Sequence, residues 1–183
     1  IIGASKVLYL EGYLYDPPRA KEAFVKAAKI AEQSGRQVAL SLSDPFCVDR
    51  YRDEFCDLVE NHVNILFANE DEIKSLYQVD GFDEALQQVR GNCEIVALTR
   101  SSQGSVVVAG DEVHVLDAEK VEHVVDTTGA GDSYAAGFLY GLTQGRDLAT
   151  CGRIGGILAA EIISHYGARA ESDLKAVLAE KLK

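Results

Sequence analysis

The sequence DTTGAGD, at residues 126–132, separates a run of alternating strands and helices from a long segment rich in Ala and Gly. Its small residues stand immediately before a predicted helix from Gly129 to Gly145. They leave the backbone N–H groups at the helix start unshielded by side chains. Those first N–H groups have no partner within a helix, and the helix dipole places about half a positive charge there. The stretch therefore predicts a place where phosphate oxygens can bind.

The residue types within this stretch suggest how it could act chemically. Gly129 and Gly131 let a phosphate approach the main chain closely, and they allow dihedral angles that a Cβ would forbid. Asp132 falls in the first turn of the helix, where a carboxylate could accept the proton of an attacking hydroxyl. A positioned base typically raises a rate about 10²- to 10⁴-fold. An ordinary helix start, with Asp132 complementing the dipole, would have the same composition, so residue types alone leave both interpretations open.

Upstream of this stretch, short apolar runs alternate with helical patterns. The predicted strands are 7–10, 38–42, 65–68 and 94–99, and the predicted helices are 19–33, 48–60, 71–77 and 82–90. This alternation is typical of a parallel sheet with helices on both faces. The expected fold class is therefore α/β, with a partial doubly wound, Rossmann-like sheet.

The pattern changes closer to the DTTGAGD stretch. Residues 105–109 and 112–116 flank Gly110-Asp111, which predicts a tight antiparallel hairpin. Downstream, residues 147–166 predict a second long helix and residues 172–181 a last one. The sheet is therefore expected to be mostly parallel, with an antiparallel hairpin toward the C-terminal end of the chain.

Composition excludes several functional classes. The chain has 183 residues, 47% of them hydrophobic, which is enough for one substantial core. No apolar run approaches the roughly 20 residues that span a bilayer. The net charge of -11 disfavours nucleic acids and anionic membrane surfaces as partners. Four cysteines without a C-x-x-C pair predict a reduced, cytoplasmic protein, and the four scattered histidines are not at metal-ligand spacing.

Residues 126–132 match, position by position, the D-T-T-G-A-G-D signature of the ribokinase-like (PfkB) carbohydrate kinases. The chain resembles this family, and its segments 11–14 and 43–46 resemble the adenosine-kinase-like members. The resemblance implies a ribokinase-type fold. It also implies that Asp132 is the catalytic base that deprotonates the substrate hydroxyl.

The same resemblance assigns roles to the rest of the signature. The amides of Gly129, Ala130 and Gly131 would form an anion hole for the charge that develops during phosphoryl transfer. Asp126 and Thr128 stand where members of the family hold a monovalent cation such as K⁺.

A second match with the family lies at the end of the third predicted strand. The N-x-x-E motif of the family corresponds to Asn69 and Glu72, where the resemblance implies positioning of Mg²⁺ and phosphate, partly through water. Asn followed three residues later by Glu is also the pattern of a helix capping box. The two roles do not exclude each other.

Two further segments resemble the nucleotide pocket of the family. Residues 99–104 correspond to a T-x-G-x-x-G motif in which Ser101 replaces the first glycine, leaving Thr99 and Gly104 as expected pocket residues. This segment also has the pattern of a strand that turns into a hairpin. The helix through Gly156 and Ala159 resembles the one that covers the adenine, although small residues there equally suit tight helix packing. The Walker loop and the G-x-G-x-x-G fingerprint are absent.

The resemblance implies an ATP-dependent enzyme that moves the γ-phosphate onto an alcohol group of a sugar or nucleoside, using ATP, Mg²⁺ and K⁺. The alternative is a non-catalytic module that binds a nucleotide or forms oligomers on the same fold. Residues 1–183 correspond to the C-terminal portion of such a kinase, so we expect the chain to be a fragment that is inactive alone. In the family, the preceding half supplies a lid that also mediates homodimers.

Overall fold

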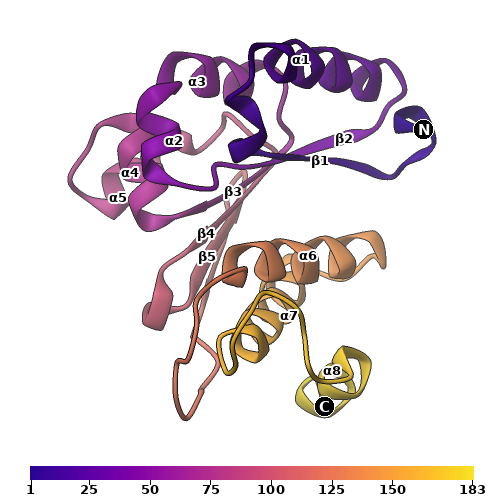
Figure 1. Ribbon diagram of the computed structural model, residues 1–183, viewed down its shortest axis with the longest axis vertical. Coiled ribbons are helices and arrows are strands. Elements are labelled where there is room, and N and C mark those ends of the chain that lie inside the picture. The colour runs from indigo at the N-terminus through magenta and orange to yellow at the C-terminus, as the bar shows by residue number, and fades with distance from the viewer. The chain divides into compact units, whose positions relative to one another are not determined.

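The computed structural model describes residues 1–183 and has an α/β fold built on a six-stranded sheet (Figure 1). The order of strands along the sheet follows the sequence. The strands are β1 (Val7–Glu11), β2 (Gln37–Ser41), β3 (Ile65–Asn69), β4 (Ile95–Thr99), β5 (Ser105–Ala109) and β6 (Glu112–Leu116). β1 pairs with β2 and β2 with β3 in parallel, whereas β4 to β6 are antiparallel. The predicted α/β class, with a mostly parallel sheet and a hairpin, is confirmed.

The chain divides into two compact units, and the first comprises residues 1–98 and 108–113. Its helices are α1 (Pro18–Gln33), α2 (Pro45–Arg50), α3 (Arg52–Asn61), α4 (Glu70–Tyr77) and α5 (Phe82–Val89). In Figure 1, α1 runs along β1 and β2, and α4 packs between α2 and α5. The apolar runs of β2 and β3 are buried almost throughout, as expected of parallel strands in an α/β sheet.

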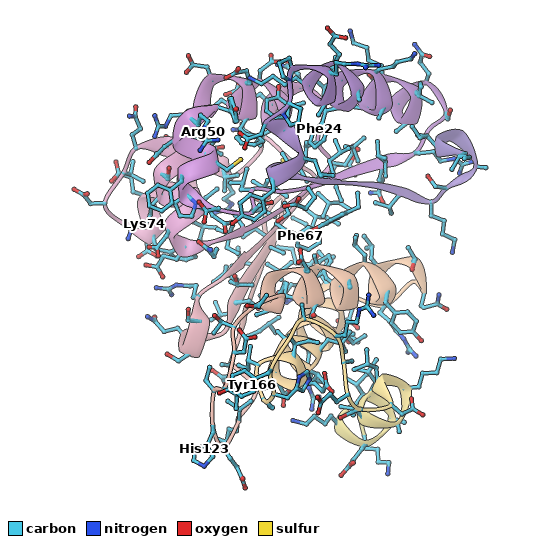
Figure 2. All side chains as sticks on the ribbon, viewed as in Figure 1. Phe24, Arg50, Phe67, Lys74, His123 and Tyr166 are labelled. Atoms are coloured by element: carbon cyan, nitrogen blue, oxygen red, sulfur yellow. The ribbon has the colours of Figure 1, made fainter.

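The core of the first unit includes an aromatic group beneath α1. Phe24, labelled in Figure 2, packs edge-on against Tyr15 at 5.3 Å between ring centroids, and Tyr15 also contacts Phe55 at 5.1 Å. The ammonium group of Lys21 lies 3.9 Å from the centroid of the Tyr51 ring. This packing fixes the start of α1 against α3.

The second unit comprises residues 99–107 and 114–183. It contains α6 (Ala130–Thr143), α7 (Leu148–Ile162) and α8 (Leu174–Lys181). The helices α6 and α7 pack closely because glycines face each other: a Cβ on Gly137 would lie 2.9 Å from the Cα of Gly155. Leu174, Val177 and Leu178 of α8 pack on the buried side chains of α7. None of the helices in either unit is both long and apolar enough to cross a membrane.

Several helix boundaries differ from the prediction. The single helix expected over 48–60 is two helices, α2 and α3, separated at Tyr51, whose φ is -129°. α2 begins earlier because the Asp44 side chain accepts the Phe46 N–H at 2.7 Å and Pro45 occupies the first helical position. The helix expected over 147–166 ends at Ile162, four residues early, and α8 begins at Leu174 after the Asp173 cap.

Candidate functional site

Asp126 ties the signature segment to the loop that follows α7. Its Oδ1 accepts the N–H of Thr128 at 2.9 Å, which closes a tight local turn, and its Oδ2 accepts the N–H of Gly167 at 3.0 Å. The Gly167 N–H, followed by the Thr128 N–H, lowers the pKa of Asp126 below its usual value. The carboxylate predicted to help bind a cation is therefore also a structural anchor of this segment.

Gly129 is the residue before α6, and only glycine fits there. Its φ is +80°, and a Cβ would stand 2.6 Å from the Cβ of Ala168. As a glycine it has no side chain with which to cap the first turn of α6. The predicted helix start is confirmed to within one residue, and its main chain lies directly against the loop after α7.

The backbone donors at this helix start are not equivalent. The N–H of Ala130 donates to the carbonyl oxygen of Thr127 at 3.2 Å, whereas the N–H groups of Gly129 and Gly131 donate to no backbone acceptor. A Cβ on Gly131 would meet no atom within 4 Å, so the space beside it is open. Asp132 is exposed in the first turn of α6. The arrangement leaves two of the three predicted amides ready for an anion, with a carboxylate on the same turn.

The segment 99–104 forms a compact turn between β4 and β5. The Arg100 N–H donates to the Gly104 carbonyl at 2.7 Å. Gly104 has a φ of +83°, and a Cβ there would lie 1.9 Å from the carbonyl oxygen of Leu116. Ser101 has a φ of +50°, in the left-handed region that favours glycine, which accounts physically for the glycine usual at this position. The turn is confirmed, and the nucleotide-binding role of Thr99 and Gly104 stays a prediction.

The glycines of α7 separate into two groups. A Cβ on Gly155 would lie 2.8 Å from the carbonyl oxygen of Tyr134, so helix packing requires a glycine at that position. A Cβ on Gly156 would meet only the Cγ of Glu119, at 4.0 Å. Both Gly156 and Ala159 are half-buried on the helix. Close packing therefore does not explain the small residue at 156, and its place in an adenine pocket stays a prediction.

Asn69 and Glu72, which belong to the first unit, form a complete capping box at the start of α4. The Asn69 Oδ1 accepts the Glu72 N–H at 2.8 Å, and the Glu72 carboxylate accepts the Asn69 N–H at 2.9 Å and its side-chain amide at 2.6 Å. Glu72 is only 5% exposed. Burial raises the pKa of Glu72 to about 7, against the opposing effect of the Asn69 N–H. The capping interpretation of this motif is confirmed.

A second cluster of polar residues lies at the carboxyl ends of β1 and β2. This cluster was not expected from the sequence. Ser43, with a φ of +71°, donates to the Glu11 carboxylate through a short hydrogen bond and accepts the Gly12 N–H at 2.8 Å. The available signal was positional, because the carboxyl ends of adjacent parallel strands meet at one edge of a sheet. Nowhere in the chain are three or more His, Cys, Asp or Glu side chains arranged to hold a metal ion.

The sequence and the structure of this chain were compared with those of known proteins. The model of the pfkB family carbohydrate kinases matches residues 1–175. The structure of adenosine kinase from Sinorhizobium meliloti is similar with a TM-score of 0.95 and 48% identity, over 98% of this chain and 55% of that chain. A probable sugar kinase from Rhizobium etli CFN 42 gives a TM-score of 0.95 and 49% identity over the same shares.

Among curated proteins, an uncharacterized sugar kinase from Archaeoglobus fulgidus is 40% identical over 108 residues, which are 59% of this chain and 43% of that protein. The adenosine kinase of Saccharomyces cerevisiae is 29% identical over 91% of this chain and 52% of its own length. The chain thus spans about half the length of the relatives it matches. It belongs to the pfkB family of carbohydrate kinases.

Proposed function

We propose that the protein is an ATP-dependent phosphotransferase and that this chain carries its phosphoryl-transfer site. The observation that carries the proposal is the start of α6, where the N–H groups of Gly129 and Gly131 lack backbone acceptors and Asp132 is exposed on the same turn. Membership in the pfkB family supports the same conclusion. Because the chain spans about half of its relatives' length, the activity is proposed for the whole protein.

The proposed reaction transfers the γ-phosphoryl group to an alcohol. The alcohol oxygen bonds to the γ-phosphorus, the bond from that phosphorus to the β–γ bridging oxygen breaks, and ADP leaves. The proton of the alcohol passes to the Asp132 carboxylate. The amides at the start of α6 hold the phosphoryl oxygens on which negative charge is concentrated, and the helix dipole acts in the same direction.

Two cation sites are part of the proposal. Asn69 and Glu72 offer the oxygen donors that Mg²⁺ prefers, and Mg²⁺ would supply neutralisation of phosphate charge. The Glu72 carboxylate already accepts two hydrogen bonds from Asn69 and has a pKa of about 7, which suits contact through a water molecule of the ion. Asp126 and Thr128 would adjoin a K⁺ ion that steadies the signature segment.

Two classes of acceptor are consistent with the relatives. Their names include adenosine kinase, nucleoside kinase and sugar kinase. We therefore propose a hydroxymethyl group of a sugar or of a nucleoside ribose as the acceptor. Thr99, Gly104, Gly156 and Ala159 are proposed to border the nucleotide of ATP.

The decisive experiment replaces Asp132 by Asn in the full-length protein. Phosphate transfer from ATP to a panel of sugars and nucleosides is followed by ³¹P NMR of the products. We expect Asp132→Asn to lower kcat about 10³-fold through loss of the general base, with the Kd for ATP within about threefold because the amides remain. The matched variant Asp80→Asn, in an exposed loop of the first unit, should keep wild-type activity.

Two outcomes would overturn the proposal. A wild-type protein that binds ATP but phosphorylates no alcohol would be a non-catalytic nucleotide-binding module. A large loss of ATP binding in Asp132→Asn would make this aspartate structural.

A further inference from the structure

The loop of residues 163–173 connects α7 to α8, and we refer to it as the post-α7 loop. It contains no regular secondary structure, and most of its side chains are exposed. Tyr166, labelled in Figure 2, is 82% exposed. A loop with so few buried side chains depends on specific hydrogen bonds for its conformation.

This loop supports the signature segment and the residue before it, Val125, at three points. The Val125 N–H donates to the Ile163 carbonyl at 2.8 Å, and the Gly167 N–H donates to Asp126 at 3.0 Å. Between these bonds and α6, Gly129 lies against Ala168. The backbone that presents the predicted anion-binding amides therefore rests on the post-α7 loop.

Glu161, in the last turn of α7, holds the far end of the same loop. Its Oε1 accepts the N–H groups of Ser172 at 2.8 Å and Glu171 at 3.0 Å. Its side chain is only 8% exposed. Its Oε2 is buried without a hydrogen bond and lies 3.4 Å from the Nε2 of His165. Burying a carboxylate is costly, so its position at this junction calls for a role beyond helix formation.

We propose that Glu161 is a positioning residue for phosphoryl transfer: by holding the post-α7 loop it keeps Ala168 against Gly129 and so fixes the amides at the start of α6. This inference rests on the proposed function of that helix start. The carboxylate of Glu161 bonds to the Glu171 and Ser172 amides of the loop, so its effect on the signature segment passes through the loop.

His165 completes the contact with Glu161. Its Nδ1 lies 3.3 Å from the Tyr166 carbonyl, which can only accept, so Nδ1 carries a proton and Nε2 carries one only in the imidazolium form. The Tyr166 carbonyl, together with Glu161 and Glu171, raises the pKa of His165 against the effect of burial. Burial raises the pKa of Glu161, but the Ser172 and Glu171 amides and His165 bring it below its usual value.

The sign of the pH dependence follows from these directions. The contribution of Glu161 to the stability of the folded state is present above pH 4.5 and is lost as the pH falls through its lowered pKa. The contribution of His165 to that stability is lost as the pH rises through its raised pKa. Other charged groups face the same hollow as Glu161. They are Lys120, Glu122 and His123 from the segment before the signature, and Lys181 from α8.

The test compares Glu161→Ala and Glu161→Gln with the matched exposed control Glu180→Ala in the full-length protein. Glu161→Ala should lower kcat about tenfold, because misplaced amides act on charge in the transition state, with a smaller change in the KM for ATP. Glu161→Gln keeps an acceptor for both loop amides, and its side-chain NH₂ can donate to neutral His165. Relative to Glu161→Ala, this variant should recover activity at pH values above the pKa of His165 and lose it at pH values below that pKa. The wild type should show the opposite pH dependence. Glu180→Ala should match the wild type.

Hydrogen exchange gives a readout that does not depend on activity. Glu161→Ala should speed amide exchange about tenfold at residues 126–131 as well as at 163–172. Faster exchange confined to 163–172, or an unchanged kcat in Glu161→Ala, would overturn the positioning role. If the wild-type protein transfers no phosphate, the proposed function fails, while the exchange at 126–131 still decides whether Glu161 positions this segment.

Discussion

The helices α4 and α6 begin in opposite ways although their sequences look alike. Each has an acidic residue three positions after the residue that precedes the helix: Glu72 after Asn69, and Asp132 after Gly129. At α4 the asparagine accepts an amide and the glutamate folds back, so the start of the helix is closed and buried. At α6 the glycine provides no acceptor and the aspartate is exposed.

This difference shows which residue decides the role of a helix start. An acidic residue at the third helical position is compatible with a cap and with a catalytic site. The preceding residue separates the two, because only a side chain with an acceptor can occupy the first amides. A glycine leaves those amides to water or to a ligand.

The largest effect is expected from a substitution that disrupts the contact between Gly129 and Ala168 at the start of α6. Gly129→Ala should lower the free energy of unfolding by about 3 kcal/mol. Left-handed backbone costs an alanine about 1–2 kcal/mol, and the methyl group would overlap Ala168 at 2.6 Å, adding about 1–3 kcal/mol. Urea denaturation gives the stability, and kcat should fall more than 100-fold in the protein that remains folded.

Gly145→Ala is the matched control for this change. Gly145 has a φ of +73°, but a Cβ there would meet no atom within 4 Å. It should therefore show only the backbone cost of about 1 kcal/mol. Equal losses in the two variants would mean that Ala168 does not brace the start of α6.

The sequence predicted local features of this site and missed the distant ones. The small residues at 129–131 and the Asn69–Glu72 spacing indicated two helix starts, because capping and glycine conformation are local properties. Nothing local indicates that Gly167 would donate to Asp126, 41 residues away. The break at Tyr51 also has no Gly or Pro signal, and the 48–60 segment was therefore predicted as one helix.

The closed start of α4 should make stability depend on pH. Because burial raises the pKa of Glu72 from 4.5 to about 7, the folded state holds a proton there that the unfolded state has released between those values. The free energy of unfolding should therefore fall by roughly 2–3 kcal/mol between pH 4.5 and pH 7. Denaturation in EDTA, at several pH values, measures this slope.

Glu72→Gln should flatten that slope while keeping the cap, since a glutamine also serves at this position of a capping box. The exposed neighbour Asp71, changed to Asn, should leave the slope unchanged. If the free energy of unfolding of Glu72→Gln still falls with pH as in the wild type, other groups cause the pH dependence. Glu72 and Asp132 would then not differ in the way proposed for the buried and the exposed acid.

The smallest effect is expected from Gly131→Ala, which also distinguishes an effect on ATP binding from an effect on stability most clearly. Gly131→Ala adds a methyl group where no atom lies within 4 Å and where φ is not positive. Alanine favours a helix over glycine by up to about 1 kcal/mol, so stability should be unchanged or slightly higher. The same methyl group occupies the open space beside the unpaired amides, so kcat/KM for ATP should fall about tenfold.

Gly81→Ala, at the start of α5, provides the comparison, because it also adds a methyl group at a helix start where the nearest atom is 3.8 Å away. It should match the wild type in activity, and its stability should be slightly lower, because alanine is a poorer N-cap residue than glycine. If Gly131→Ala also keeps wild-type activity, the space at the start of α6 does not receive phosphate. The openness of this helix start would then be only a consequence of its glycines, and the contrast with α4 would carry no chemistry.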